Sequence, residues 1–340
     1  MEKPRKLVVI LPAHNEEKTI GRVIDGFPKN IDGIGETELI VVNDGSTDGT
    51  EHVARSHGAQ VIDHPRRRGV GAAVQTGLRA GLKRGADIIV NIDADGQFDA
   101  GDIPAVIEPI LAGRAGFATA SRFARADYVP EMPRLKRWGN RCMSRIVNFA
   151  TGTTSLSDVS CGFRAFSADA ALKLHLSGSF THVQETIIDL ANKHVRMEEV
   201  PVRVRGVREY GRSRLANNLL VYAIRTGGRI LLTMCRTRPI FFFGSVSTVL
   251  LSLGMLQGAF LVVHWLLTRR TSPFRALLIG CSLFIILGFA TGLLALLADM
   301  LRHQIDTSER LLYFERLRRH NQAQNTKDAD ASGAARDAGP

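Results

Sequence analysis

The chain has 340 residues, enough for one large domain or two smaller ones, and 45% of them are hydrophobic. Its formal net charge of +11, from 44 basic and 33 acidic residues, favours a phosphate-rich partner such as a nucleotide, a nucleic acid or an anionic lipid. The four cysteines, Cys142, Cys161, Cys235 and Cys281, lack metal-ligand spacing, and we interpret them as reduced thiols.

Short apolar runs alternate with helical patterns over the first hundred residues. Each run is continuous, which is typical of strands buried on both faces. We expect strands at residues 7–11, 38–43, 59–63 and 88–92, with helices at about 17–27, after residue 48, and at 70–84. Strands that alternate with helices predict an α/β domain with a mostly parallel sheet.

Two carboxylates follow the fourth predicted strand. Residues two apart in an extended segment point the same way, so Asp93 and Asp95 face one spot. Such oxygen ligands suit Mg²⁺ or Mn²⁺, a diphosphate can complete the shell, and Gln97 adds a neutral oxygen nearby. Taken alone, the pattern also fits a solvated turn at Gly96.

The loops after three of these strands are polar. Asn15-Glu16 follows the first strand, Asp44 the second and Asp93 the fourth. Ligands of open parallel sheets bind beyond the carboxyl ends of the strands, so the three loops predict one crevice. A dinucleotide site is disfavoured, because the glycine pair at Gly69–Gly71 follows the third strand and position 74 is valine where that motif needs glycine.

Several short motifs reveal a family resemblance. Leu11–Glu17, Val42–Thr50 and Asp93–Gln97 are together similar to family 2 glycosyltransferases of the GT-A fold, a likeness that covers residues 7–215. Within that family the chain most resembles the dolichyl- and polyprenyl-phosphate sugar synthases, through the motifs Ala120–Phe123, Asp158–Arg164 and Tyr210–Arg214. The resemblance implies a nucleotide-diphosphate sugar as donor, a lipid phosphate as acceptor and a divalent cation, Mg²⁺ or Mn²⁺, as cofactor.

The same resemblance gives individual residues expected roles. The expected contacts to the nucleotide sugar are Pro12, Ala13, Asn15, Glu16, Asp44, Gly69, Asp93 and Ala94. The expected metal ligands are Asp93, Asp95 and Gln97. Arg122 and Arg212 are expected to face phosphates and, with Asp93 and Asp95, form the expected catalytic set.

The segment from residue 134 to 149 combines two stripes at helical spacing. The basic stripe is Arg134, Arg137, Arg141 and Arg145, and the apolar stripe is Leu135, Trp138, Cys142, Ile146 and Phe149. A basic amphipathic helix with a tryptophan suits a membrane interface, where Arg134 and Arg137 could grip the acceptor phosphate. A surface helix that packs its apolar side on the sheet fits the pattern equally well.

Two further carboxylates are candidates for the acceptor side. A phosphate acceptor is ionised at neutral pH and needs positioning more than a base. Glu185 could be the base for a hydroxyl acceptor, although the start of an amphipathic helix explains it as well. Asp158 is either catalytic or a cap for the turn at Gly162, and we favour a structural role near the site.

Two segments are long and apolar enough to cross a bilayer. Residues 240–267 contain no Asp, Glu, Lys or Arg, residues 276–298 contain none either, and each exceeds the roughly 20 residues that a bilayer requires. We expect a catalytic domain at 1–213, a juxtamembrane amphipathic helix at 214–238, a transmembrane hairpin within 239–299, and a basic, then disordered, tail at 300–340. The outer flanks are more basic than the connecting loop, which predicts a multi-pass cell-membrane protein with its catalytic domain and both termini in the cytoplasm.

These observations predict metal-dependent transfer of a hexose to a polyprenyl or dolichyl phosphate. GDP-mannose is the donor we favour, with UDP-glucose and UDP-N-acetylglucosamine as alternatives. The rival interpretations are a glycosyltransferase that acts on a hydroxyl, such as a polysaccharide or glycolipid synthase, and a membrane-anchored nucleotide-sugar binding protein without catalysis. A nucleic-acid partner is not expected, because the basic residues lack an interleaved aromatic platform. The sequence predicts no oligomeric state.

Overall fold

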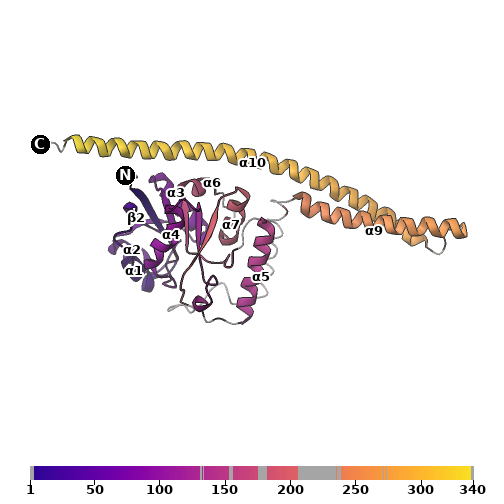
Figure 1. Cartoon of the computed structure of the whole chain (residues 1–340), viewed down its shortest axis with the longest axis horizontal. Helices are drawn as coiled ribbons and strands as arrows, with labels where there is room; N and C mark the ends of the chain where they lie inside the picture. Colours follow the sequence, from indigo (N-terminus) through magenta and orange to yellow (C-terminus); the bar gives the residue numbers. More distant parts are fainter. Residues whose placement is uncertain are drawn as a thin grey trace. The chain divides into compact units, whose positions relative to one another are not determined.

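The computed structural model describes residues 4–130, 132, 134–152, 156–174, 182–205, 235, 239–270, 272 and 274–337 (Figure 1). Internal contacts divide the chain into two compact units, residues 1–217 with 312–340, and residues 218–311. Apart from Cys235, the expected juxtamembrane helix at 214–238 lies outside the described residues.

The described part of the first unit is built on a seven-stranded sheet of order β3-β2-β1-β4-β6-β5-β7. The strands are β1 (Arg5–Ala13), β2 (Ile34–Asn43), β3 (Gln60–Asp63), β4 (Ile88–Asn91), β5 (Phe117–Ser121), β6 (Arg164–Ser167) and β7 (Met197–Pro201). All neighbouring pairs are parallel except those of β6, which runs antiparallel to β4 and β5. The predicted mostly parallel sheet and its first four strands are confirmed.

Helices cover both faces of this sheet. They are α1 (Glu17–Asp25), α2 (Thr50–Ser56), α3 (Val70–Lys83), α4 (Ile103–Leu111), α5 (Arg134–Thr151), α6 (Ala168–Lys173) and α7 (His182–Asn192), with short 3-10 turns at Ala100–Asp102 and Ala126–Tyr128. Strand β1 shows the two layers, because Val9 and Leu11 join one buried cluster with α1 and α4, whereas Val8 and Ile10 join another with α3 and α7.

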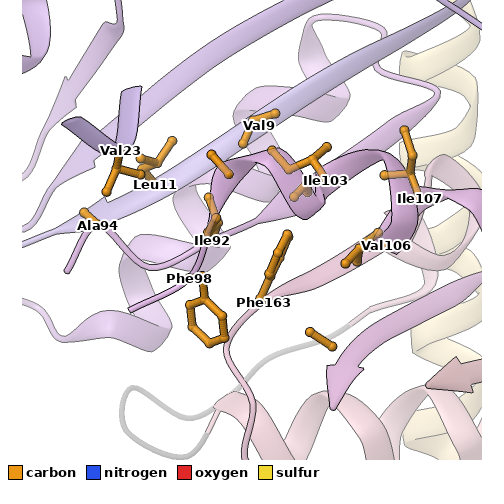
Figure 2. Packing of buried hydrophobic residues seen from close by; sticks show 14 of the residues in the cluster. Val9, Leu11, Val23, Ile92, Ala94, Phe98, Ile103, Val106, Ile107 and Phe163 are labelled. Carbon is orange, nitrogen blue, oxygen red and sulfur yellow. The ribbon is translucent and has the colours of Figure 1, made fainter. Parts of the chain in front are cut away.

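The first of these clusters anchors two loops at the carboxyl edge of the sheet. Phe98 comes shortly after the Asp93–Asp95 turn, and Phe163 follows Gly162. Their rings meet edge to face with centroids 5.5 Å apart, beside Ile92 and Ile103 (Figure 2). Edge-to-face aromatic pairs stabilise the packing of the segments that carry them, so this contact helps to anchor both loops on the apolar core.

The second unit contains two long apolar helices, as predicted. Helix α9 (Pro239–Thr268) and the first part of α10 (Arg275–Asp337) are each long and apolar enough to span a membrane. Small residues let them pack closely, because a Cβ on Gly254 or Gly288 would come within 2.8 or 2.7 Å of the facing helix. Ser247 Oγ also donates to the Gly288 carbonyl at 2.7 Å.

The structure describes α10 as far as Asp337, and the disordered part of the tail expected within residues 300–340 stays a prediction. The stretch 293–332 contains no glycine or proline that would end a helix. Within the first unit, the tail also contacts the sheet domain. Tyr313 donates to Asp169, Arg316 donates to the Leu174 carbonyl, and His320 Nδ1 lies 3.0 Å from the Leu82 carbonyl.

Candidate active site

Parallel pairing brings the carboxyl ends of three strands to one edge of the sheet. Strand β1 lies between β2 and β4, and Ala13 pairs with Asn43 while Ile10 pairs with Asn91. Pro12 and Ala13 are the last residues of β1, so the loops after β1, β2 and β4 leave the sheet side by side. Hydrogen bonds between these loops confirm the predicted convergence.

Asn15 and Glu16 join the loop after β1 to the loop after β2. The Thr47 N–H donates to Asn15 Oδ1 at 2.9 Å, and the Asn15 N–H donates to Ser46 Oγ at 3.0 Å. The Glu16 N–H donates to Thr50 Oγ1 at 2.9 Å. Asn15 has a φ of +57°, a left-handed conformation that asparagine tolerates better than most residues. Its side chain therefore links the two loops at the edge where the nucleotide site is predicted.

Asp44 is almost fully buried and accepts hydrogen bonds from two loops. Its Oδ1 lies 2.8 Å from His64 Nδ1 and accepts the Arg68 N–H at 2.8 Å, while its Oδ2 accepts the Gly69 N–H at 2.7 Å. Burial alone raises the pKa of Asp44, but these hydrogen bonds hold that pKa below its ordinary value, so the carboxylate is ionised. His64 Nε2 lies 3.0 Å from Thr76 Oγ1. The ionised carboxylate only accepts, so Nδ1 carries the proton.

Sequence reasoning did not single out His64. It follows β3 directly, and a position after a parallel strand was the one signal that could have found it. Gly69, expected to contact the nucleotide sugar, has a φ of +96° and gives its N–H to Asp44. A Cβ on Gly45 would lie 2.6 Å from the Arg67 backbone nitrogen, so the loop after β3 packs directly over the end of β2.

The turn after β4 carries the three predicted metal ligands. Thr19 of α1 donates through Oγ1 to the Ala94 carbonyl at 2.8 Å, which fixes the turn against the loop after β1. Asp95 is 5% exposed, and its Oδ1 accepts the Gln97 N–H at 3.1 Å. Asp93 is half-buried on the same turn. The structure thus places Asp93, Asp95 and Gln97 together.

Gly162 brings a second loop against Asp93. A Cβ at Gly162 would lie 2.5 Å from Asp93 Oδ2, so any larger residue would displace the Asp93 carboxylate. Asn91 of β4 holds the same loop by donating through Nδ2 to the Gly162 carbonyl at 2.7 Å. Strand β4 therefore holds Gly162 and also leads into the turn that carries Asp93.

The donor set fits a divalent cation that is shared with a phosphate-bearing ligand. No group of three or more His, Cys, Asp or Glu side chains that could hold a metal ion occurs in the described part of the chain, so phosphate oxygens would be needed as further ligands. Asp93 and Asp95 offer hard carboxylate oxygens. Gln97 Nε2 donates to the Arg205 carbonyl at 3.2 Å, which leaves the amide oxygen as its ligand atom. Phosphate oxygens would complete the shell.

Arg122 and Asp158 form a buried bidentate pair. Arg122 Nε donates to Asp158 Oδ2 at 2.6 Å, and its Nη2 donates to Oδ1 at 2.9 Å. Burial alone lowers the pKa of Arg122, but Asp158 raises that pKa above its ordinary value, so the guanidinium stays charged. Both Asp158 oxygens are engaged and its side chain has no exposed area, which fits the expected structural role better than a base.

Glu199 of β7 holds the loop that carries Asp158, and sequence reasoning did not select it. It accepts the Asp158 N–H at 2.7 Å and the Ser157 hydroxyl at 2.8 Å. Ser157 Oγ lies 2.9 Å from Ser121 Oγ, at the end of β5 next to Arg122. Glu199 pairs with Thr119 across β5 and β7, so sheet register brings this carboxylate to the loop.

Buried Arg164 joins the same loop to α7. It donates to the Cys161 carbonyl at 2.8 Å and to the Val183 carbonyl at 2.6 Å. Burial lowers the pKa of Arg164 to about 10. Glu185, two residues beyond Val183, is half-buried on α7, which packs against α5. The structure thus places Glu185 near the loop that carries Asp158.

The predicted arginines lie in different settings. Arg134 is exposed on α5, whereas Arg137 is half-buried on the same helix. Arg212 lies outside the described residues, so its expected contact stays a prediction.

Comparison with known proteins assigns the chain to a family. Residues 8–174 match the family model described as glycosyl transferase family 2. An uncharacterised protein of Methanocaldococcus jannaschii is 34% identical over 64% of this chain and 89% of its own length. The chain belongs to glycosyltransferase family 2.

Two named relatives of this glycosyltransferase are more distant. UDP-N-acetylglucosamine–dolichyl-phosphate N-acetylglucosaminyltransferase of Methanococcus voltae is 29% identical over 64% of the chain and 92% of the relative. Polyprenol monophosphomannose synthase of Mycolicibacterium smegmatis is 28% identical over 63% of the chain and 82% of the relative.

A solved structure confirms the expected GT-A fold. Glucosyl-3-phosphoglycerate synthase from Mycobacterium tuberculosis, in complex with Mn²⁺, UDP-glucose and phosphoglyceric acid, matches with a TM-score of 0.52 and 27% identity. The match covers 68% of this chain and 80% of that chain.

Proposed function

We propose that this glycosyltransferase moves a hexose from a nucleotide-diphosphate sugar to a polyprenyl or dolichyl phosphate, in a reaction that requires Mg²⁺ or Mn²⁺. The observation that carries the proposal is one loop with two contacts. Gly162 touches Asp93, and Asp158 grips Arg122, so donor-side carboxylates and a phosphate-binding cation flank the same segment. The names of both relatives, which include dolichyl phosphate and polyprenol, support a lipid-phosphate acceptor.

In the proposed reaction a lipid-phosphate oxygen attacks the anomeric carbon opposite the leaving nucleoside diphosphate, and this single displacement inverts that centre. Asp93, Asp95 and Gln97 would hold the cation, which supplies Lewis-acid neutralisation of the charge that the leaving group gains. Arg122, kept charged by Asp158, stabilises phosphate charge in a partly buried site. The acceptor is already ionised, so Glu185 would shape the site without removing a proton.

The donor and the location follow from the same proposal. GDP-mannose remains the donor we favour, and the relatives' names cover both mannose and N-acetylglucosamine transfer. Helices α9 and α10 would hold the protein in the cell membrane as a multi-pass anchor. With both termini in the cytoplasm, the site would face the nucleotide sugars of that compartment.

A transfer assay tests this function on the full-length protein in detergent. Mn²⁺ and a polyprenyl phosphate are supplied, and labelled GDP-mannose, UDP-glucose and UDP-N-acetylglucosamine are offered separately. We expect one donor to label the lipid phase, and a chelator to stop the transfer. Asp95→Asn is expected to abolish transfer without changing the melting temperature, whereas Asp99→Asn, at an exposed carboxylate nearby, serves as the active control.

Two results would contradict the proposal. Full activity of Asp95→Asn would remove that carboxylate from the metal site. Absence of transfer from every donor, in a protein that still binds nucleotide, would favour a hydroxyl acceptor and make Glu185 the candidate base.

A further inference from the structure

Helix α5 leaves its largest described apolar side chains on its outer face, unlike a helix on a water-soluble surface. Its large apolar residues point outward, with Trp138 64%, Phe149 63% and Ile146 41% exposed. The face toward the domain is mixed, with Val147 buried in the core beside the polar Ser144 and Thr151. A helix in water buries its largest apolar side chains, so the outer face of α5 suits a non-aqueous neighbour, and its inner face also makes polar contacts.

The inner face is attached to the loop that positions Arg122. Ser144 Oγ donates to the Ser157 carbonyl at 2.9 Å. Asn148 exchanges two hydrogen bonds with the backbone of Leu156, each 3.1 Å long. Ser157 directly precedes Asp158, the partner of Arg122, so α5 holds the loop one residue away from that ion pair.

Two donors on the same face have no hydrogen-bond partner in the part of the chain that the structure describes. Arg137 and Asn140 lie one to two turns before Ser144, at a spacing that puts them on one side of a helix. Arg137 Nε and Asn140 Nδ2 are both buried, and neither has a hydrogen-bond partner among the described residues. Buried polar groups are ordinarily paired, so two adjacent unpaired donors indicate a ligand rich in acceptor oxygens.

A phosphate monoester with an apolar chain satisfies these features together. Its oxygens only accept, and its charge suits the guanidinium of Arg137. Its chain would continue along the non-aqueous side that Trp138 and Phe149 mark. The other arginines on α5 that are described, Arg134, Arg141 and Arg145, are exposed, so only Arg137 of this stripe is placed for such a contact.

We infer that Asn140 and Arg137 together bind the phosphate of the lipid acceptor, with Asn140 as a contact that distinguishes a phosphate monoester from an alcohol. This inference rests on the proposed function and deepens it. It separates the basic stripe into an inner residue that binds substrate and outer residues, Arg141 and Arg145, that face lipid head groups.

Steady-state kinetics on the full-length protein in detergent test this division. Arg137→Gln and Asn140→Asp are each expected to raise the KM for polyprenyl phosphate on the order of 10- to 100-fold, since each removes a hydrogen bond to a charged group. The KM for the nucleotide sugar is expected to stay within about twofold of wild type. Arg141→Gln, which removes the same charge from the outer face, is the matched control and is expected to leave both KM values unchanged.

Binding measurements test the same inference even if the protein shows no transfer activity. Farnesyl phosphate, farnesol and inorganic phosphate are titrated separately into wild type, Asn140→Asp and Arg141→Gln. We expect farnesyl phosphate to bind wild type far more tightly than farnesol, and Asn140→Asp to lose that preference. Asn140→Ser replaces Asn140→Asp if the latter lowers the melting temperature.

The outcomes separate the inference from the proposed function. If wild type shows no lipid transfer but prefers farnesyl phosphate through Asn140, the function fails and the site stands. If transfer occurs while Asn140 and Arg137 variants keep the wild-type lipid KM, the inference is overturned. Equal losses in Arg141→Gln would also overturn it, because the effect would then be general charge. Binding of inorganic phosphate as tightly as farnesyl phosphate would show an anion site without lipid specificity and overturn it as well.

Discussion

The buried contact between His64 and Asp44 can be dissected one atom at a time. His64 Nδ1 lies 2.8 Å from Asp44 Oδ1, and Nε2 lies 3.0 Å from Thr76 Oγ1. The amide nitrogen of asparagine can replace Nδ1, whereas that of glutamine can reach the position of Nε2. His64→Gln therefore removes the donor to Asp44 and keeps a group near Thr76, while His64→Asn does the reverse.

The expected magnitudes follow from these partners. A hydrogen bond to an ionised group contributes about 1.5–3 kcal/mol. Asp44 retains the N–H groups of Arg68 and Gly69 in His64→Gln, so we expect a loss of about 2 kcal/mol in the free energy of unfolding. For a domain of about 200 residues this lowers the melting temperature by about 4–8 °C. His64→Asn is expected to lose about 1 kcal/mol, because only a neutral contact is missing.

Thermal unfolding of the full-length protein in detergent, followed by circular dichroism, measures these differences. The pKa of Asp44 is lowered in the folded state, so its stabilisation is present above the ordinary carboxyl pKa and is lost as the pH falls through the lowered value. The gap between wild type and His64→Gln should therefore be present at pH 7, begin to shrink below about pH 4 and close as the pH falls through the lowered pKa. Equal melting temperatures for His64→Gln and His64→Asn at pH 7 would refute a specific role for the contact to Asp44.

Three other substitutions test separate contacts. Asp158→Asn leaves Arg122 buried with less charge compensation and should lower the free energy of unfolding by about 3 kcal/mol. A change in melting temperature of under a degree would contradict this expectation. Gly162→Ala adds a Cβ 2.5 Å from Asp93 Oδ2 and should raise the Mn²⁺ concentration for half-maximal transfer at least about tenfold, so an unchanged metal titration would contradict the close approach. Gly288→Leu should separate α9 from α10 and speed hydrogen exchange in α9, whereas wild-type protection would show that the hairpin does not need this glycine.

The sheet was predictable where strands are buried on both faces. Residues 7–11 and 88–92 form continuous apolar runs, and the structure has β1 and β4 there. Strand β6 was not predicted. Its four residues, Arg164–Ser167, include a buried arginine and carry no local period, and their antiparallel pairing depends on contacts with β4 and β5.

The candidate site was predictable where its chemistry is local. Asp93 and Asp95 are two residues apart after a strand, and that spacing alone brings them together. Partners distant in sequence were not predictable, because strand order decides which loops meet. His64 therefore could not be assigned to Asp44 from the sequence, and the pairing of Asp158 with Arg122 was equally hidden.

Burial decides between the two interpretations of α5. A surface helix packed on the sheet would bury Trp138, Ile146 and Phe149, and that interpretation is wrong because all three are exposed. The apolar stripe was visible in the sequence, but periodicity shows only that two faces differ. On the inward face, Val147 joins the buried core, and Ser144 and Asn148 hold the loop backbone.

The loop Leu156–Phe163 connects the two halves of the proposed reaction. One end holds Asp158 against Arg122, and the other places Gly162 against Asp93. A displacement of the Asp93 carboxylate on metal and donor binding would press on Gly162 and, through the segment, on Asp158. Acceptor binding would then depend on a loaded donor. Gly162→Ala should therefore raise the KM for the lipid phosphate along with the metal requirement, and a change in the metal requirement alone would show that the two halves act independently.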